Sequence, residues 1–477
     1  MKRPPTSALL CESQMALFAD FYEFTMGQAD VNDGNRAICT ANYFVRSIPQ
    51  GHYLILAGME QIVHYILNLR FTDADLEWLR KSQIAPNMSD EFVDYLRGFK
   101  FRGDIHAIPE GTPVFANEPL INITGPTIDV QMFETYLLSV MNFQTLIATK
   151  TSRMVRAARG GTCFDFGARR AHGRDAGILA ARASFIGGAA GTSLVAAGRY
   201  FDIPCVGTVA HKFILDRPVE LEAFRAYAKS FPHDTVLLID TYETIQGAKN
   251  ACLVGKEMEA QGYRLRGVRL DSGDLLKLSQ EVRSILDASG LTYVQIFASG
   301  DLDEFKIDQL TAQKAPIDGF GIGTRLATGA NFNPLTGEGG VSALPGVYKH
   351  VERNDGSDVI PTMKFSDEPG KSTLPARKQV YRFLNAEGCY ERDVISLWGE
   401  SSQEGEALLV PIMHQGRLVY NFPSVTELQA RTAEELSKLP ERHMTLTDGN
   451  AYPVTLSPQL TQLRSRLSRE SRSVSQN

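Results

Sequence analysis

The sequence predicts an α/β protein with two domains, an α/β barrel and a domain of mixed α+β structure. Its 477 residues exceed the size of one ordinary domain. From about residue 150, short apolar strands alternate with helical segments, which is typical of a parallel sheet, and six or more such units favour a barrel. Short alternating runs broken by Gly and Pro flank this region and indicate antiparallel sheets.

The mixed domain is expected to begin at the N-terminus and to cover residues 1–145. Residues 15–66 are predicted to be mainly helical with a strand at 41–45, and residues 100–125 have the pattern of a small antiparallel sheet. Residues 378–456 return to short strands, so 361–460 is expected to rejoin this domain. Residues 461–477 are polar and low in complexity, and we predict a disordered tail there.

The barrel is expected over residues 146–360. Its predicted strands cover residues 163–166, 203–209, 235–240, 267–271, 294–299 and 318–323, with helices at 244–260 and 274–288. A polar cluster follows each strand, at 165–170, 208–211, 240–243, 269–274, 299–301 and 321–325. A barrel places the carboxyl ends of its strands on one face, so these clusters are predicted to converge on one site.

Composition narrows the functional class. The formal net charge of −6 argues against nucleic acid or an anionic membrane as the main partner. The six cysteines are scattered without a C-x-x-C pair, which favours free thiols in a reducing compartment over disulfides or a structural zinc. No apolar run approaches the roughly 20 residues that span a bilayer, and the N-terminus is a poor signal peptide. We therefore expect a cytoplasmic enzyme.

Residues 164–211 form the most informative block. Arg169 and Arg170 follow one predicted strand, a stretch rich in Ala and Gly comes next, and a second strand runs into His211. Arginines, backbone N–H groups exposed by small residues and a titratable His suit a phosphorylated substrate. Neither G-x-G-x-x-G nor G-x-x-x-x-G-K-[ST] is present, so a dinucleotide fold or a Walker loop is not predicted.

Eight ordered motifs resemble the nicotinate phosphoribosyltransferase family. They cover residues 17–29, 43–60, 164–211, 237–251, 268–275, 318–326, 346–352 and 364–382. The resemblance implies an irregular α/β barrel of the type II phosphoribosyltransferase kind plus a smaller mixed α+β domain built from both chain ends, paired as a homodimer with a shared active site. It also implies that nicotinate and phosphoribosyl pyrophosphate give nicotinate mononucleotide and pyrophosphate, with Mg²⁺ present and ATP hydrolysis coupled through a phosphohistidine.

The same resemblance assigns roles to individual residues. His211, which ends the G-T-V-A-H motif, matches the phosphorylated histidine, and a neutral imidazole is a competent nucleophile toward a phosphoryl group. Phe166 matches a ring that stacks on the pyridine, and Arg169 matches a contact to phosphate. Tyr22 would stack on the same ring from the partner subunit. Lys212 follows His211 where Ser or Glu is common in the family, and a cation there would depress the pKa of His211.

Further positions follow from the remaining motifs. Asp271 takes the ribose role and Arg269 binds the nicotinate carboxylate, while Ser193 selects the acid over the amide unless it only caps the next helix. The 5′-phosphate would be held by backbone N–H groups of Gly300, Gly321, Gly323 and Thr324. Asp240 and Glu243 are metal ligands or caps, and Asp274 is a ribose or Mg²⁺ ligand or a cap. A loop with Lys364 and Lys371 is a phosphate clamp or a mobile surface loop, with Ala376 where the family usually has Gly.

Three other functions compete with this interpretation. A nicotinamide phosphoribosyltransferase would share the fold and the chemistry. A quinolinate phosphoribosyltransferase would share the fold but is typically shorter and needs no ATP. A catalytically dead relative would only bind pyridine nucleotides, although His211, Arg169, Arg269 and Asp271 are all retained.

Overall fold

The computed structural model describes residues 12–48, 52–82, 88–332, 339–340, 342–356, 358–366, 371–447 and 450–474. The chain divides into two compact units. Unit 1 contains Met1–Thr145, Leu344–Pro423 and Glu434–Asn477, and unit 2 contains Leu146–Ala343 and Ser424–Ala433. The chain thus returns to unit 1 at residue 344 rather than at 361, and it then contributes one more segment to unit 2.

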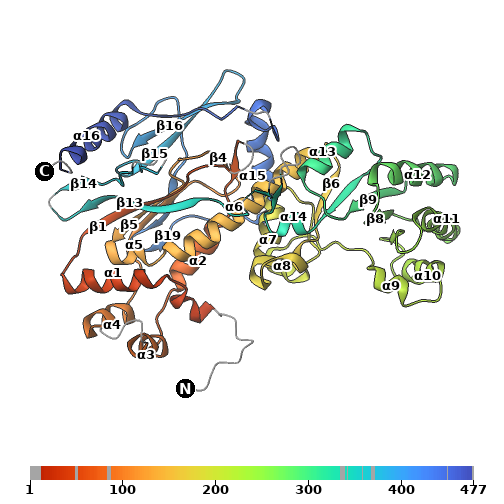
Figure 1. The fold of residues 1–477 in the computed structure, drawn as a ribbon, viewed down its shortest axis with the longest axis horizontal. Helices are drawn as coiled ribbons and strands as arrows, with labels where there is room; N and C mark the ends of the chain where they lie inside the picture. The colour runs from red at the N-terminus through yellow and green to blue at the C-terminus, as the bar shows by residue number, and fades with distance from the viewer. Residues whose placement is uncertain are drawn as a thin grey trace. The chain divides into compact units, whose positions relative to one another are not determined.

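Unit 1 contains a seven-stranded antiparallel sheet with the order β14-β13-β1-β5-β3-β18-β19 (Figure 1). Its strands are β14 (Val359–Pro361), β13 (Gly346–Asn354), β1 (Ile38–Val45), β5 (Ile121–Pro126), β3 (Asp104–Ala107), β18 (Val410–His414) and β19 (Arg417–Leu418). In β1, Ala41, Tyr43 and Val45 on one face are fully buried, and Thr40 and Asn42 on the other face are buried too, so both faces of this strand are covered. The strand expected at 41–45 and two strands of the region expected as a sheet at 100–125, β3 and β5, thus belong to one sheet.

The rest of unit 1 consists of smaller sheets and helices. A four-stranded sheet has the order β17 (Glu406–Ala407), β15 (Lys378–Leu384), β16 (Tyr390–Leu397) and β20 (Val454–Leu456), and β2 (Leu54–Ile55) pairs with β4 (Pro113–Val114). The helices include α1 (Phe21–Asn32), α2 (Met59–Asn68), α3 (Asp73–Lys81), α4 (Asp90–Arg97) and α5 (Thr127–Gln131). Two longer helices, α6 (Glu134–Ala157) and α15 (Val425–Lys438), contribute to both units.

The C-terminal segment corrects one prediction. Residues 461–474 of the expected disordered tail belong to helix α16 (Pro458–Val474), and residues 475–477 lie outside the described residues. Leu460 is fully buried, and Leu463 and Leu467 are half-buried. Leucines at these positions share one helix face, so a short apolar stripe stabilises a segment whose composition is otherwise Ser and Arg.

Unit 2 contains a five-stranded parallel sheet with the order β6-β10-β9-β8-β7 (Figure 1). The strands are β6 (Thr162–Asp165), β10 (Gly319–Ile322), β9 (Gln295–Ser299), β8 (Gly267–Leu270) and β7 (Val236–Leu238). Leu238, Val268 and Ile296 are fully buried, as expected for parallel strands that helices cover.

The helices of unit 2 lie between and after these strands in the chain. They are α7 (Arg174–Ile186), α8 (Val195–Phe201), α9 (His211–Leu215), α10 (Glu220–Ser230), α11 (Thr244–Ala260), α12 (Leu275–Ala288), α13 (Glu304–Ala312) and α14 (Thr324–Ala327). Helices α11 and α12 match the two helices predicted from the sequence. The alternation of strand and helix produces the α/β core that the sequence predicts.

The predicted strand at 203–209 is wrong. Beyond β6 the sheet continues only through two single parallel bridges, from Asp165 to Thr192 and from Thr192 to Cys205. Pro204 has no N–H to donate to a ladder. Its carbonyl accepts from the Thr192 N–H at 3.0 Å, and the Val206 N–H donates to Thr192 O at 2.9 Å. The barrel is therefore irregular on this side.

Candidate active site

A cavity of about 780 Å³ lies at the carboxyl ends of the unit 2 strands. The predicted site residues that line it are Phe166, Arg169, Ser193, His211, Arg269, Asp271, Gly300, Gly321, Gly323 and Thr324. They come from separate segments of the chain, and the sheet brings them together. Tyr22 lies on α1 in unit 1, and Lys364 and Lys371 lie in a different segment of the same unit. None of these three residues lines the cavity.

His211 is the first residue of helix α9 and is 41% exposed. Its Nδ1 lies 3.1 Å from Thr241 Oγ1, and its Nε2 lies 3.7 Å from Asp271 Oδ2. A carboxylate only accepts hydrogen bonds, whereas a hydroxyl can also donate. A proton on Nε2 would point toward Asp271, which lies beyond hydrogen-bond distance, and the Nδ1 lone pair would then accept from the Thr241 hydroxyl.

Lys212 faces away from this chemistry. Its Nζ forms an ion pair with Asp216 one helical turn later, and its side chain is 82% exposed. Lys212 does not line the cavity. The cation expected beside the imidazole is therefore paired within α9.

Asp271 is held by two neighbouring strand ends. Its backbone N–H donates to Asp240 Oδ2 at 2.9 Å, and the Ser299 hydroxyl donates to its Oδ1. The Ser272 hydroxyl also donates to Asp240 Oδ2, at 2.7 Å. Asp240 thus braces the turn that presents Asp271 to the cavity.

Two other carboxylates that sequence left open between metal binding and capping are helix caps. Glu243 is the N-cap of α11 and accepts from the N–H groups of Ile245 and Gln246. Asp274 is the N-cap of α12 and accepts from the Lys277 N–H at 3.2 Å. Ser193 is not a cap, because the N-cap of α8 is Leu194 and no side chain bonds there.

Arg269 and Phe166 form the inner wall. The Arg269 guanidinium lies 6.0 Å from the centre of the Phe166 ring and donates to Val209 O at 3.2 Å. Burial lowers the pKa of Arg269, although the carboxylates of Asp271 and Asp240 oppose that shift. A buried guanidinium beside an aromatic face suits a flat anionic ring.

Glycines bring the backbone close to the cavity. Gly300 has φ +95°, and a Cβ there would lie 2.1 Å from Asp271 O. A Cβ on Gly321 would lie 2.5 Å from the Phe166 ring. Only glycine fits either position, so the chain can approach a phosphate or a stacked ring there.

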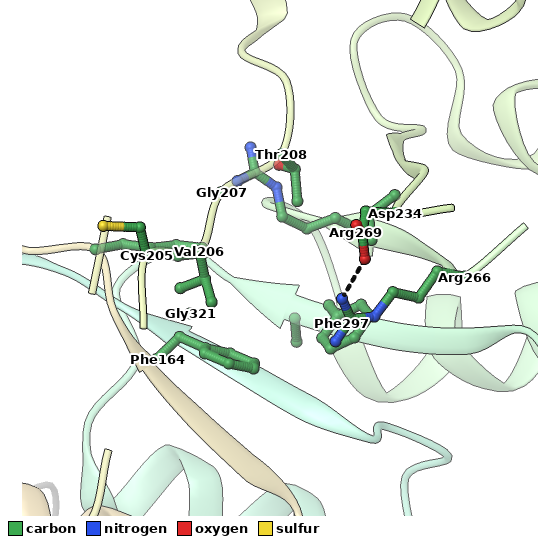
Figure 2. A pocket seen from close by; sticks show the side chains of 13 residues that line it. Phe164, Cys205, Val206, Gly207, Thr208, Asp234, Arg266, Arg269, Phe297 and Gly321 are labelled. Atoms are coloured by element: carbon green, nitrogen blue, oxygen red, sulfur yellow. Dashed lines mark hydrogen bonds and ion pairs between the residues drawn. The ribbon is translucent and has the colours of Figure 1, made fainter. Parts of the chain in front are cut away.

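A second cavity of about 260 Å³ adjoins the first and shares Phe166, Gly207, Thr208, Arg269 and Gly321 with it. The rings of Phe164 and Phe297 line it with centroids 6.2 Å apart, and the ion pair of Arg266 and Asp234, 3.1 Å long, lies near Phe297 (Figure 2). The interior behind Phe166 is thus incompletely filled, unlike the packed core of a regular barrel.

Comparisons with known proteins identify the family of this chain. Three family models match: the nicotinate phosphoribosyltransferase N-terminal domain over residues 17–142, the nicotinate phosphoribosyltransferase family over 162–386, and its C-terminal domain over 401–464. The nicotinate phosphoribosyltransferase pncB2 of Mycobacterium tuberculosis is 40% identical over 455 residues, covering 95% of this chain and 94% of that protein. The chain belongs to the nicotinate phosphoribosyltransferase family.

Other members of the family extend the match. The nicotinate phosphoribosyltransferase of Bacillus subtilis is 35% identical over 94% of each chain. The crystal structure of human nicotinic acid phosphoribosyltransferase superposes with a TM-score of 0.82 at 28% identity, covering 94% of this chain and all of that one. The chain is accordingly a nicotinate phosphoribosyltransferase with the type II fold, and the nicotinamide, quinolinate and inactive alternatives are not supported.

The family typically uses Mg²⁺, and the donors at the site fit a weakly held ion. Among the residues described, no group of three or more His, Cys, Asp or Glu side chains could hold a metal ion. Mg²⁺ often needs only one or two carboxylates when substrate phosphates and water supply the other ligands. Asp271 and Asp301 both line the cavity and are the carboxylates available for this.

No helix in the described part of the chain is long and apolar enough to cross a bilayer.

Three hydroxyl residues of this nicotinate phosphoribosyltransferase site had no role predicted from the sequence, although Thr241 and Ser299 lie in the predicted polar clusters 240–243 and 299–301. Thr241 contacts His211, Ser299 contacts Asp271, and Thr192 contacts Asp165. Each is a small hydroxyl residue in a common polar context, so no motif singles it out. Ala376, where the family usually has Gly, adopts φ +62°. Left-handed backbone is easiest for glycine, which gives a physical reason for the family's preference.

Proposed function

We propose that this cavity holds nicotinate and phosphoribosyl pyrophosphate and that His211 couples the transfer to ATP hydrolysis. The observation that carries the proposal is the convergence on one cavity of an aromatic ring, two cation-bearing segments, a carboxylate and a histidine. Each group would serve a separate step of the reaction. The ring stacks on the base, the cations neutralise charge, the carboxylate contacts the ribose, and the histidine accepts the phosphoryl group.

Phe166, Arg269 and Ser193 would bind the base. The pyridine ring stacks on Phe166, and its carboxylate takes charge-assisted hydrogen bonds from Arg269 and Ser193. Tyr22 from the second copy of a homodimer would close the other face of the ring. Stacking holds the ring nitrogen in line with ribose C1, which converts a bimolecular step into an oriented one.

Transfer at C1 breaks one bond and forms another. The C1–O bond to pyrophosphate breaks with its electron pair leaving on the oxygen, and the lone pair of the pyridine nitrogen forms the new C1–N bond. Asp271 holds the ribose hydroxyls through the oxocarbenium-like transition state, and Arg169 stabilises charge on the leaving group. The N–H groups of Gly300, Gly323 and Thr324 hold the 5′-phosphate. When bound at Asp271 and Asp301, Mg²⁺ would supply further charge neutralisation for pyrophosphate.

His211 accepts the γ-phosphoryl group of ATP at Nδ1. The N–P bond forms as the bond from phosphorus to the ADP oxygen breaks, and the Nε2 proton stays directed at Asp271, which stabilises the charged ring. Water later cleaves the N–P bond, and phosphate leaves. Asp271 therefore faces both the histidine and the ribose, which supports coupling of the two steps.

The free cysteines favour a reducing, cytoplasmic location for this enzyme. Cys39, Cys163, Cys205, Cys252 and Cys389 are all unpaired in the described residues.

Labelling with γ-labelled ATP tests the histidine assignment. The wild-type protein should acquire one acid-labile, base-stable label per site, and His211→Ala should lose it while a slow ATP-independent transfer of nicotinate persists. Thr241→Val should keep the label at a reduced rate, because the ring loses its orienting contact. Full labelling of His211→Ala would remove the assignment.

A further inference from the structure

One wall of the cavity lacks the support of a regular strand. Residues 187–210, which carry Ser193, contain no regular strand of the sheet. They join it through single bridges at Thr192 and Cys205 and through the Ala190 N–H, which donates to Cys163 O at 2.8 Å. Ser193 itself is exposed. Backbone hydrogen bonds hold residues 190–193 against β6, but no regular ladder continues past Ser193, so a side-chain contact adds to the support of this residue.

Asp165 supplies that support. It is the last residue of β6, and its side chain is 1% exposed. Oδ1 accepts from the Gly167 N–H at 2.8 Å, directly after Phe166, and Oδ2 accepts from the Thr192 hydroxyl at 2.7 Å, directly before Ser193. Its backbone N–H donates to Gly191 O at 2.9 Å, and its carbonyl accepts from Ser193 N–H at 2.8 Å. Both carboxylate oxygens are therefore used, one on each side of the base site.

Thr192 extends the connection to the next residue. It is fully buried, and its Oγ1 accepts from the Leu194 N–H at 3.1 Å while its hydrogen is donated to Asp165. Ser193 thus lies between two residues that one hydroxyl holds. Phe166 is fixed from the other direction, because its N–H donates to Ile322 O at 2.7 Å.

We propose that the Asp165–Thr192 pair is a positioning element that sets the spacing of Phe166 and Ser193 and so tunes affinity for the planar aromatic carboxylate. The proposal rests on the proposed function, since it takes Phe166 and Ser193 as the groups that read the base. Neither Asp165 nor Thr192 lines the cavity, so both act through their neighbours. Asp271 and Gly300, on the phosphoribosyl side of the site, follow strands β8 and β9 rather than β6.

Thr192→Val is the decisive variant. It keeps the shape of the side chain but leaves Asp165 Oδ2 and the Leu194 N–H without their partner. We expect KM and the dissociation constant for nicotinate to rise about tenfold, the effect of one lost hydrogen bond to a charged group. KM for phosphoribosyl pyrophosphate should rise less than KM for nicotinate, because Asp271 and Gly300 lie on other strands and only Arg169 and Gly323 lie beside Asp165. The preference for nicotinate over nicotinamide should also fall, since Ser193 is no longer held in register.

Two companion variants separate positioning from general damage. Thr192→Ser keeps the hydroxyl and should restore nicotinate affinity. Thr235→Val is the matched control: Thr235 is fully buried in unit 2, its hydroxyl donates to Phe231 O at 2.6 Å, and it does not line the cavity. It should leave both KM values unchanged.

The measurements are steady-state kinetics in each substrate and calorimetric titration with nicotinate. A wild-type protein that binds nicotinate without turning it over would contradict the proposed function, while the titrations of the variants would still decide the positioning role. The inference is overturned if Thr192→Val raises both KM values equally, if Thr192→Ser fails to restore affinity, or if Thr235→Val gives the same loss.

Discussion

Lys150→Met should destabilise unit 2 by removing one half of a buried ion pair. Lys150 on α6 donates to Glu304 Oε1 at 3.0 Å and to Oε2 at 2.7 Å, and each side chain is only 1% exposed. Removing one partner of a buried pair leaves an uncompensated charge and costs about 3–5 kcal/mol. Glu304 opens α13 directly after the loop that carries Gly300, so KM for phosphoribosyl pyrophosphate should rise as well.

The assay must report on unit 2 alone. Both tryptophans, Trp78 and Trp398, belong to unit 1, so hydrogen exchange of peptides from α6 and α13 is the better measure of unit 2 opening. Lys256→Met is the matched control, because Lys256 is 49% exposed in a surface pair with Glu259 and should change stability by less than about 1 kcal/mol. Lys150→Met with Glu304→Leu should recover most of the loss, since an apolar pair replaces the ions. A loss below about 1 kcal/mol in Lys150→Met would refute this reasoning.

Two further predictions concern specificity and pH. Ser193→Asp should lower kcat/KM for nicotinate about tenfold or more and raise it for nicotinamide, because a carboxylate repels the substrate acid and accepts from an amide; an unchanged preference would show that Ser193 does not read the base. Burial raises the pKa of Glu23 to about 7, so the folded protein holds a proton that the unfolded chain releases at lower pH. Stability from this group is therefore present at low pH and is lost as pH rises, by about 3 kcal/mol between pH 4.5 and 7. Urea titrations of Glu23→Gln should lack this fall, and parallel pH profiles for wild type and variant would contradict it.

The strands of unit 2 could be predicted because buried parallel strands are continuous apolar runs between helices. Residues 235–240, 267–271, 294–299 and 318–323 each contain a strand of the observed sheet. The run at 203–209 has the same composition, yet Pro204 has no N–H to donate to the neighbouring segment, and a single bridge forms at Cys205. Such an exclusion depends on which segment lies alongside, and composition does not record that. The helix at 458–474 was not predicted because the average composition of this segment is polar, although three leucines on one helix face stabilise it.

The site residues also fall into those that the sequence could predict and those that it could not. Residues that face the cavity were predictable because each follows directly after a strand, where a parallel sheet must place its ligand groups. The contacts that hold these residues in place could not be predicted, because the partners are distant in sequence. Lys150 and Glu304 are 154 residues apart, Asp240 and Asp271 are 31 apart, and Asp165 and Thr192 are 27 apart. A buried polar group is stable only when paired, so each of these side chains depends on the fold for its partner, and the fold in turn depends on the pair. Substitutions at such pairs should therefore alter substrate affinity without touching substrate, which is the behaviour expected of Thr192 and Lys150.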